Sequence, residues 1–388
     1  MDEDRRARAV LTALTEPGDP VLWRHVSRCG AAQTLQAIRR GTYPARNREA
    51  LGERLRSLDV DQLWREADRC HARLLCPGDA EWPEDSTARL VGAAPEEPAS
   101  PRERDGPPLA LWVRGGADLA TVLRRSCALV GSRAATGYGI AIAGELAADL
   151  AHRGFAIVSG GAFGVDAAAH RGALAVNGNT VAVLASGVDR AYPRAHEMLL
   201  SRIVDEGLVL SEVPPGWLPT RPRFLVRNRL IAALTAGTIV VEAALRSGAL
   251  NTAGWAHSCG REVMAVPGPV TSDMSAGVHQ LLRQGGAQLV TTAAEVAEQI
   301  GALGEDLAPD QRGETRSRDE LEPRARDVVE ALPVRKPVGL ARIAGQAGLH
   351  PDEARAVLGR LMLDGYAEHH EDGWRLSAEE RYRLRRHP

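Results

Sequence analysis

Short apolar runs alternate with longer amphipathic stretches between residues 109 and 303. The runs are rich in Val, Ile, Leu and Ala and are bounded by Gly, Ser or Pro, which is typical of strands buried on both faces of a parallel sheet. Between two of them, Tyr138, Ile142, Leu146 and Leu150 recur every four residues, as on one face of a helix. The pattern predicts an α/β domain with a doubly wound, mostly parallel sheet. The predicted strands are 127–130, 156–158, 181–185, 208–210, 238–241, 262–266 and 288–290.

The segments on either side of this domain have different patterns. Residues 1–75 predict a domain of short helices, and residues 76–108, rich in Pro, Glu, Gly and Ala, predict a loop-like linker or extension. Residues 304–322 are polar and charged and predict a second linker. The last block, 323–388, predicts three helices followed by a β-hairpin, which is the element order of a winged helix. Its predicted helices are 325–332, 340–347 and 352–364, and its hairpin strands are 366–370 and 374–376.

Composition excludes several classes of protein. The 388 residues, 44% hydrophobic and 25% charged, have the balance of a soluble globular protein, and no run of 18 apolar residues predicts a membrane span. The acidic start is followed by no apolar stretch, so we expect no secretory signal. The five cysteines are scattered and form no CxxC pair, which favours reduced thiols in the cytoplasm and predicts no metal site.

Lysine is almost absent: of 48 basic residues, only Lys336 is a lysine. A P-loop needs a lysine beside its Gly-rich turn, and no such turn precedes Lys336, so a Walker-type NTPase is excluded. Schiff-base chemistry would depend on Lys336 alone. Because the formal net charge is only −2, a nucleic-acid site would have to be a local patch of arginines.

Candidate chemistry follows the predicted strands, because doubly wound sheets bind ligands outside the carboxyl ends of their strands. Gly-rich turns at helix starts present backbone N–H groups, hydroxyls add donors, and arginine forks suit phosphate oxygens. Phosphate binding is therefore the favoured function of these turns. The candidate residues are Gly131, Ser132, Arg133, Ser159, Gly160, Gly161, Gly164, Arg227, Asn228, Arg229, Ser247, Gly248 and Thr252.

The arginines near residue 227 stand in an unusual window. Residues 213–241 contain four arginines and no Asp or Glu, which predicts either a local positive patch or an ordinary solvated helix face. Structural roles are open for the other groups as well. The glycines could simply serve tight turns, Asp166 could begin a helix, and His170 could pack in the interior.

The sequence predicts no cofactor and no catalytic constellation. Gly137-Tyr138-Gly139 lacks the third small residue of a dinucleotide-binding turn, and no acid follows the strand 156–158 to hold a ribose. Neither an HExxH nor a GxSxG motif is present. A phosphate-binding surface without an evident catalyst is what remains.

Four signatures in order resemble the DNA-processing protein A (DprA/Smf) family. They cover about residues 109–300, and their combination is highly specific. The flanking helical and winged-helix blocks also resemble the layout of family members. The signatures are Val130-Gly131-Ser132-Arg133 with Tyr138-Gly139, the stretch from Ser159 to Leu174, Arg227-Asn228-Arg229-Leu230-Ile231, and Gly260 to Gly268.

The resemblance implies an extended Rossmann-like domain that binds single-stranded DNA and is not an enzyme. It also implies a homodimer that protects incoming DNA during natural transformation and loads the RecA recombinase against single-strand-binding protein. By position, Arg133, the loop from Ser159 to Gly164 and Arg227-Asn228-Arg229 would line the DNA pocket, with Gly248 and Thr252 at its border. The chain departs from the family pattern at Leu225, where Pro is usual, and at Ala233, where Gly is usual. Both changes leave the arginines intact.

Binding of single strands also requires surfaces on which bases stack. Aromatic residues make up only 4% of the chain, and the candidates near the predicted pocket are Phe163 and Phe224. Our hypothesis is that one of them stacks a base; the alternative is that both pack in the interior.

Two other functions stay open at this point. A nucleotide phosphoribohydrolase also has a Gly-rich loop after a strand, but its second signature is incomplete around 246–252. A winged-helix transcription regulator is the other alternative. Its expected recognition helix carries Arg355 and Arg360 against Asp352, Glu353 and Asp364, which is weak charge for reading a duplex.

Overall fold

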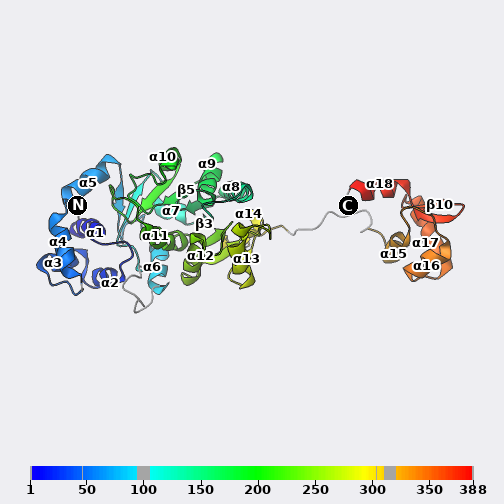
Figure 1. Cartoon of the computed structure of the whole chain (residues 1–388), viewed down its shortest axis with the longest axis horizontal. Helices are drawn as coiled ribbons and strands as arrows, with labels where there is room; N and C mark the ends of the chain where they lie inside the picture. Colours follow the sequence, from blue (N-terminus) through cyan, green and yellow to red (C-terminus); the bar gives the residue numbers. More distant parts are fainter. Residues whose placement is uncertain (1, 46, 94–104, 303, 310–319, 387–388) are drawn as a thin grey trace. The chain divides into compact units, whose positions relative to one another are not determined.

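The computed structural model describes residues 2–45, 47–93, 105–302, 304–309 and 320–386 (Figure 1). The chain divides into two compact units, residues 1–308 and 309–388. Residues 94–104 of the predicted extension and 310–319 of the predicted linker lie outside the described residues.

A nine-stranded sheet forms the centre of the first unit, in the order β1-β2-β6-β5-β4-β3-β7-β8-β9. From β6 to β9 every neighbouring pair is parallel. The predicted α/β class with a mostly parallel, doubly wound sheet is confirmed, because every predicted strand of this domain is present. The strands are β1 (Arg73–Leu75), β2 (Leu111–Arg114), β3 (Ser126–Val130), β4 (Ala156–Ser159), β5 (Thr180–Val183), β6 (Leu208–Ser211), β7 (Gly237–Val240), β8 (Glu262–Ala265) and β9 (Gln288–Leu289).

Two strands were not predicted from the sequence. β1 pairs with β2 and β2 with β6, both antiparallel, so they extend the sheet beyond β6. β1 has three residues and β2 has four, too few to show a period in the sequence. Trp112 of β2 is fully buried and is the largest buried side chain at this end of the sheet.

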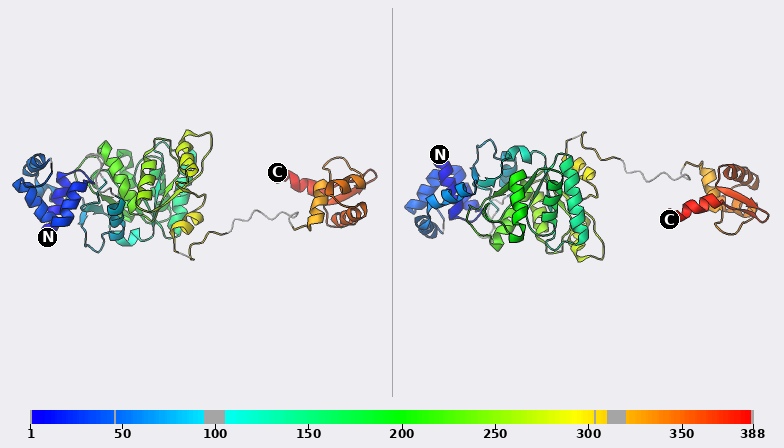
Figure 2. Two further views of the ribbon diagram at one scale, coloured as in Figure 1. Left: turned by 90° about the horizontal axis from the view of Figure 1, so that it is seen from below. Right: turned by 90° about the horizontal axis from the view of Figure 1, so that it is seen from above.

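Helices cover both faces of the sheet, as the views in Figures 1 and 2 show. One apolar layer packs against α6 (Glu84–Ala93), α7 (Leu119–Leu123), α11 (Arg221–Ala233), α12 (Gly248–Ser258) and α13 (Ala276–Arg283). The opposite layer packs against α8 (Gly137–His152), α9 (Val165–Ala175), α10 (Glu197–Glu206) and α14 (Ala293–Ile300). The sheet interior is therefore sealed from water on both sides, and its loops at the strand ends are left to bind ligands.

Helix α6 corrects the sequence analysis, which predicted a loop for the whole of 76–108. Leu90 of this helix is fully buried in the layer beside α11. Weak periodicity concealed the helix because its stability comes from this tertiary packing more than from a repeating apolar pattern.

The N-terminal helices join the sheet in one unit. Ala9, Ala13, Leu63 and Ala67 share an apolar cluster with Trp112 of β2. The helices are α1 (Glu3–Leu14), α2 (Pro20–Cys29), α3 (Ala31–Arg40), α4 (Arg48–Ser57) and α5 (Val60–Arg69). This shared cluster means that α1 and α5 contribute to the core that supports the sheet.

The second unit has the predicted order of three helices and a hairpin. The interpretation of this order as a winged helix stays a prediction, and the terminal helix α18 was not predicted. Val338 forms an isolated bridge to Trp374 of the hairpin. The elements are α15 (Pro323–Ala331), α16 (Leu340–Ala347), α17 (Pro351–Leu363), β10 (Ala367–His370), β11 (Gly373–Leu376) and α18 (Ala378–Arg386).

Candidate functional site

The carboxyl ends of the parallel strands meet at one edge of the sheet, where the strand order reverses. β4 lies on one side of β3 and β7 on the other. Such a reversal is the position at which doubly wound sheets bind ligands. The loops that follow the strands at this edge therefore form the candidate site.

A cleft of about 730 Å³ opens among these loops and the start of α11. We call it the arginine–aromatic cleft. It is built from the loops after β3, β4 and β5 and from the segment that leads into α11. Of the residues predicted from the sequence, four line it: Arg133, Gly160, Phe163 and Phe224.

The segment after β5 adds seven lining residues that were not predicted from the sequence. Arg190, Tyr192 and Arg194 are basic or aromatic, and the others are Asp189, Ala191, Pro193 and Glu197. A signal for them was present. This loop follows the predicted strand 181–185, so it ends at the same edge as the loops that were selected. It lacks the glycine-rich turn that marks the loops after β3 and β4 in the sequence.

Aromatic rings form an exposed surface in the cleft. Phe163 is 47% exposed and Tyr192 is 45% exposed. Phe224 is half-buried beside Tyr192 and Arg133: its ring centroid lies 5.4 Å from that of Tyr192, and the Arg133 guanidinium lies 5.0 Å from it. Phe163 meets His196 edge-on at 4.6 Å. Phe163 and Tyr192 thus present ring surface to solvent, while Phe224 supports Arg133 and Tyr192.

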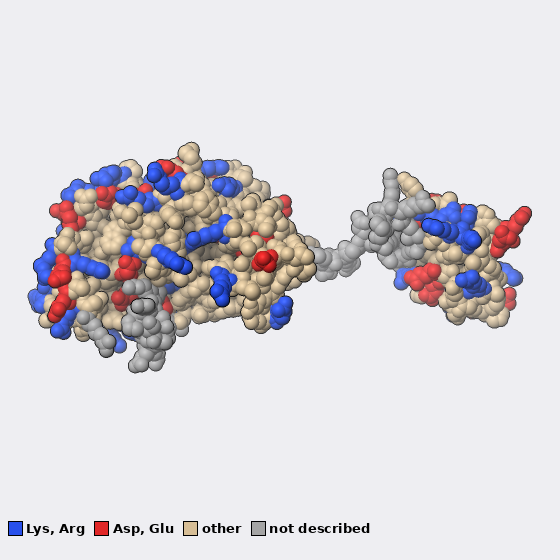
Figure 3. Space-filling model, in the orientation of Figure 1, with Lys and Arg blue, Asp and Glu red and all other residues tan. Residues whose placement is uncertain are grey.

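The arginines of the cleft are only partly compensated by acids. Arg190 contacts Asp189 at 3.3 Å, and Asp189 also accepts a hydrogen bond from the Gly216 amide. Within the described part of the chain, neither Arg133 nor Arg194 has a carboxylate within 4.0 Å. On the face of the first unit seen in Figure 3, basic side chains are spread among acidic ones and form no continuous patch. The lining of the cleft has three arginines, Arg133, Arg190 and Arg194, against two acids, Asp189 and Glu197, and so carries a small excess of positive charge.

Arg227 lies beneath the cleft and not on its surface. Its guanidinium is buried and donates to the Gly160 carbonyl at 2.8 Å. Burial lowers the pKa of Arg227 to about 10, against the opposing effect of the nearby Asp166 carboxylate. A Cβ at Gly160 would lie 2.1 Å from this guanidinium, so a larger residue there would displace the Arg227 side chain. Arg227 holds the floor of the cleft from the inside.

Two further arginines of the acid-free window, Arg223 and Arg229, are also buried and Arg221 is exposed, so three of its four arginines do not contribute to an exposed patch. Arg229 is fully buried in a bidentate ion pair with Glu212, at 2.5 and 2.7 Å. Arg223 is 6% exposed and forms a bidentate pair with Glu16, with both distances 2.8 Å. Acids from outside the window neutralise these arginines, because folding brings distant segments against α11.

The Gly-rich loop after β4 is already satisfied internally. The buried Asp166 carboxylate accepts hydrogen bonds from the Gly160 and Ala162 amides, at 3.2 and 3.3 Å. Burial raises the pKa of Asp166, and Arg227 and these amides oppose the rise. The Ser159 hydroxyl is buried and donates to the Leu129 carbonyl at 2.7 Å. Asp166 and Ser159 thus fix the loop that carries Phe163.

Two glycines allow the loops after β3 and β4 to touch. Gly164 has φ +75° and leads into α9, and a Cβ there would lie 2.2 Å from the Ser132 carbonyl. A Cβ at Gly131 would lie 2.5 Å from Val165. The Val165 amide donates to Ser132 O at 3.2 Å. Glycine is therefore required here for backbone contact, and Ser132 is buried beneath Arg133.

Four further predicted residues, Asn228, Ser247, Gly248 and Thr252, lie where α11 meets the start of α12, away from the residues that line the cleft. Asn228 donates to the Gly248 carbonyl at 3.3 Å and to the Asn251 side chain at 3.2 Å. Ser247 caps α12 through the Ala249 amide, and Thr252 is buried. These contacts join α11 to α12. The predicted set thus separates into a cleft group and a structural group.

The crevice between β3 and β7 is filled by the chain itself. The Glu242 carboxylate is buried and accepts hydrogen bonds from the Thr136 amide at 2.8 Å and the Thr136 hydroxyl at 2.7 Å. A Cβ at Gly139 would lie 2.3 Å from this carboxylate. The Glu242 side chain thus lies against Thr136 and Gly139 at the reversal point, and the lateral cleft is the candidate site.

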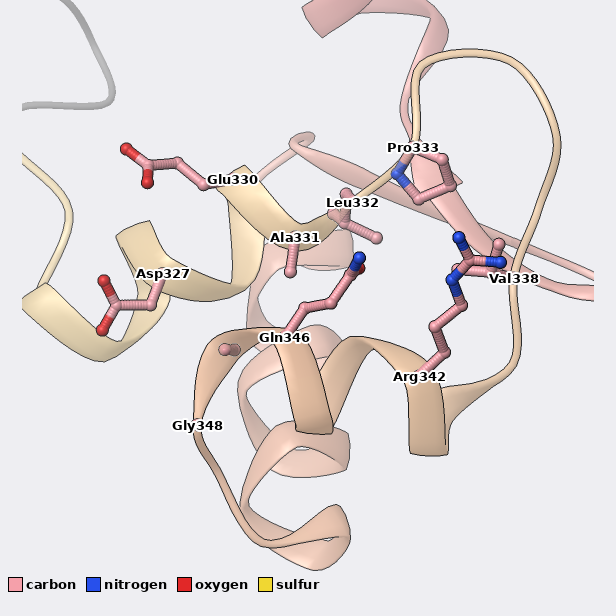
Figure 4. A pocket seen from close by; sticks show the side chains of 10 residues that line it. Asp327, Glu330, Ala331, Leu332, Pro333, Val338, Arg342, Gln346 and Gly348 are labelled. Atoms are coloured by element: carbon pink, nitrogen blue, oxygen red, sulfur yellow. The ribbon is translucent and has the colours of Figure 1, made fainter.

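The second unit has a separate groove of about 700 Å³ between α15 and α16 (Figure 4). Asp327 and Glu330 of α15 and Arg342 and Gln346 of α16 line it, over a floor that includes Leu332. With two acids and one arginine, this groove is a poor site for phosphate. Among the described residues there is also no group of three His, Cys, Asp or Glu side chains placed to hold a metal ion. No helix in the described part of the chain is long and apolar enough to cross a membrane.

Comparison with known proteins identifies the family. A family model described as DNA recombination-mediator protein A matches residues 73–301. The chain belongs to this family. The resemblance to DprA/Smf proteins that the sequence motifs indicate is confirmed, and the matched residues include the whole arginine–aromatic cleft.

Relatives in the DprA/Smf family match the chain over different lengths. A DNA processing protein of the DprA type from Mycobacterium tuberculosis is 44% identical over 380 residues, which cover 97% of this chain and 95% of the relative. Protein Smf of Escherichia coli is 43% identical over 194 residues, 50% of this chain and 51% of the relative. The X-ray structure of DNA processing protein A from Streptococcus pneumoniae aligns with a TM-score of 0.63 and 30% identity, over 78% of this chain and 99% of that chain.

Proposed function

We propose that this chain binds single-stranded DNA in the arginine–aromatic cleft. The observation that carries the proposal is the placement of two exposed rings, Phe163 and Tyr192, beside two arginines without acidic partners in the described residues, Arg133 and Arg194. Single-strand binding needs cations for phosphates and aromatic faces for bases, and the cleft combines both.

The size of the cleft supports single strands over duplexes. Its volume of about 730 Å³ lies in the range of about 300–1,000 Å³ that is typical of sites for small ligands. Individual nucleotides fit such a space, whereas a double helix keeps its bases paired and stacked away from a narrow lateral cleft. The rings are therefore useful only to unpaired bases.

Family membership supports the wider role. We infer that the chain protects incoming DNA, displaces single-strand-binding protein and delivers the strand to the RecA recombinase, acting in the cytoplasm as a homodimer and without catalysis of its own. The family description, recombination mediator, agrees with such a delivery role. No cofactor enters this proposal. The winged-helix interpretation of residues 323–388 also remains a proposal, with protein contact favoured over duplex reading.

Direct binding measurements test the proposal. Fluorescence anisotropy with a labelled oligonucleotide compares single-stranded and duplex DNA for the unaltered chain and for Arg133→Ala/Arg194→Ala. We expect preference for the single strand and a loss of about tenfold or more in the variant, since charge-assisted phosphate contacts are removed. The matched control is Arg124→Ala/Arg153→Ala, which removes two exposed arginines that precede β3 and β4 at the opposite edge of the sheet.

Three results would overturn the proposal. Equal losses in the cleft variant and in the control would mean that only net charge matters. Sequence-specific preference for duplex DNA would favour a transcription regulator. Release of a base from a nucleotide, detected by chromatography, would favour a nucleotide phosphoribohydrolase.

A further inference from the structure

The turn that follows α1 contacts α11 directly, although the two are far apart in the sequence. Glu16 lies just beyond the end of α1 and accepts two hydrogen bonds from the Arg223 guanidinium, each 2.8 Å long, across 207 residues. The Arg223 side chain is 6% exposed and that of Glu16 is 34% exposed. A bidentate pair of this kind fixes both the distance and the orientation of its partners.

Arg223 holds the wall of the arginine–aromatic cleft. Its remaining guanidinium nitrogen donates to the Leu218 carbonyl at 2.7 Å, and its guanidinium lies 5.0 Å from the Trp217 ring centroid. Leu218 and Phe224, the residue after Arg223, both line the cleft. The ion pair therefore fixes the segment from Leu218 to Phe224, which forms one wall of the cleft.

The same turn is linked to α11 a second time, through Gly106, at Arg229, six residues beyond Arg223. The Gly106 amide donates to the Gly18 carbonyl at 3.0 Å, and the Gly106 carbonyl accepts from Arg229 at 3.0 Å. A Cβ at Gly106 would lie 3.0 Å from Pro20, so the two segments are in close backbone contact. Helix α11 is thus anchored to the N-terminal helices at two levels.

We propose that Glu16 is a positioning residue for the DNA cleft: by holding Arg223, it presets Phe224 and Leu218, and through Phe224 it presets Arg133 and Tyr192. This inference rests on the function proposed above. It makes the N-terminal helices part of the binding apparatus although Glu16 does not line the cleft. Without the carboxylate, the Arg223 guanidinium loses its charged partner and must turn toward water. The cleft wall then has to be ordered when DNA binds.

The test uses Glu16→Gln in the full chain, with affinity for a single-stranded oligonucleotide measured well below the unfolding temperature. We expect affinity to fall about three- to tenfold, the cost of ordering one side chain on binding. Glu16→Asp keeps the negative charge on a side chain one methylene shorter and should give a smaller loss of affinity. It replaces Glu16→Gln in the test if that variant folds poorly. The matched control is Arg125→Gln, which breaks the bidentate Arg125–Asp306 pair beside the amino end of β3. The control should leave affinity unchanged.

A double-mutant cycle separates positioning from general stability. If Glu16 acts through Phe224, Glu16→Gln should weaken binding far less in a Phe224→Leu background than in the unaltered chain. Additive losses, or an equal loss in Arg125→Gln, would overturn the inference. So would unchanged affinity in Glu16→Gln, provided that Arg133→Ala/Arg194→Ala still binds weakly; the proposed function would then stand alone. If Arg133→Ala/Arg194→Ala itself binds normally, the proposed function fails, whatever Glu16 does.

Discussion

Three arginines of α11 and those of the cleft loops differ in what holds their charge. Arg223, Arg227 and Arg229 are buried and bind carboxylates or carbonyl oxygens of the protein. Arg133, Arg190 and Arg194 are exposed on loops at the strand ends. A guanidinium removed from water must be paired inside the protein, whereas one left in water keeps its capacity for an external anion. Proximity in the sequence therefore says little about which arginines can bind DNA.

The difference between buried and exposed arginines predicts its largest effect for Arg229→Ala, on the free energy of unfolding. Removing Arg229 leaves the Glu212 carboxylate buried without its cation, which should lower the free energy of unfolding by about 3–5 kcal/mol. Urea denaturation followed by circular dichroism measures the change. Arg194→Ala, the exposed counterpart, should change the same free energy by no more than about 0.5 kcal/mol. Similar losses in both variants would remove the distinction between the two groups.

The salt dependence of DNA binding tests whether the exposed arginines of the cleft contact phosphates. Each arginine that contacts a phosphate of a single strand adds about 0.7 to the slope of log K against log salt. Arg194→Ala should lower the slope by about this amount, with the unfolding temperature unchanged. Arg190→Ala should lower it less, because Asp189 already neutralises Arg190 in part. A salt titration in which Arg190→Ala has the larger effect would contradict this assignment.

The two exposed rings provide a smaller test. Phe163→Ala and Tyr192→Ala should each cost about 1–3 kcal/mol of single-strand affinity if the ring stacks a base. Stability should be nearly unchanged, because both side chains are close to half exposed. Phe224→Ala should lower stability as well as affinity, since Phe224 supports two neighbours. Affinity that is unaffected by Phe163→Ala and Tyr192→Ala alike would exclude stacking on either ring.

A buried histidine, His170, predicts that the free energy of unfolding depends on pH. Burial, followed by the nearby Arg227, lowers the pKa of His170 to about 3. The unfolded chain takes up this proton near the ordinary pKa of about 6.5, so below that pH the unfolded state binds more protons than the folded state. The stability that neutral His170 contributes is present above pH 6.5 or so and is lost as pH falls toward 3, with a slope of up to about 1.4 kcal/mol per pH unit.

His170→Gln should flatten this slope in urea denaturation measured between pH 7 and pH 4. The exposed His152→Gln should not. Asp166, whose raised pKa gives the opposite sign, is present in all three chains and cancels in the differences. Parallel pH profiles for His170→Gln and the unaltered chain would exclude His170 as the source.

The regular elements of the sheet domain could be predicted because buried parallel strands leave near-continuous apolar runs such as 127–130. Helix α6 could not, since its helix is held by Leu90 packing under α11, which no local pattern records. The same limit applies to β2, whose place at the sheet edge depends on pairing with β6, nearly a hundred residues later.

For the site, the sequence identified Arg133 and Phe163 because each belongs to a turn that follows a strand. It assigned Arg227 and Arg229 to the same surface, because the groups that bind them inside the protein, the Gly160 carbonyl and the Glu212 carboxylate, lie outside the local window. It missed Tyr192 because that loop has no glycine signature. The residue types in a loop can thus be read from the local sequence, whereas tertiary contacts decide which charged side chains are buried.

The Glu16–Arg223 pair also sets an order of events during synthesis. Its members are separated by 207 residues, so at 5–20 residues per second Glu16 is made roughly 10 to 40 s before Arg223. During that interval the N-terminal helices have been synthesised, but α11, the helix that they anchor, has not. The arginine–aromatic cleft is therefore complete only after most of the sheet domain has emerged.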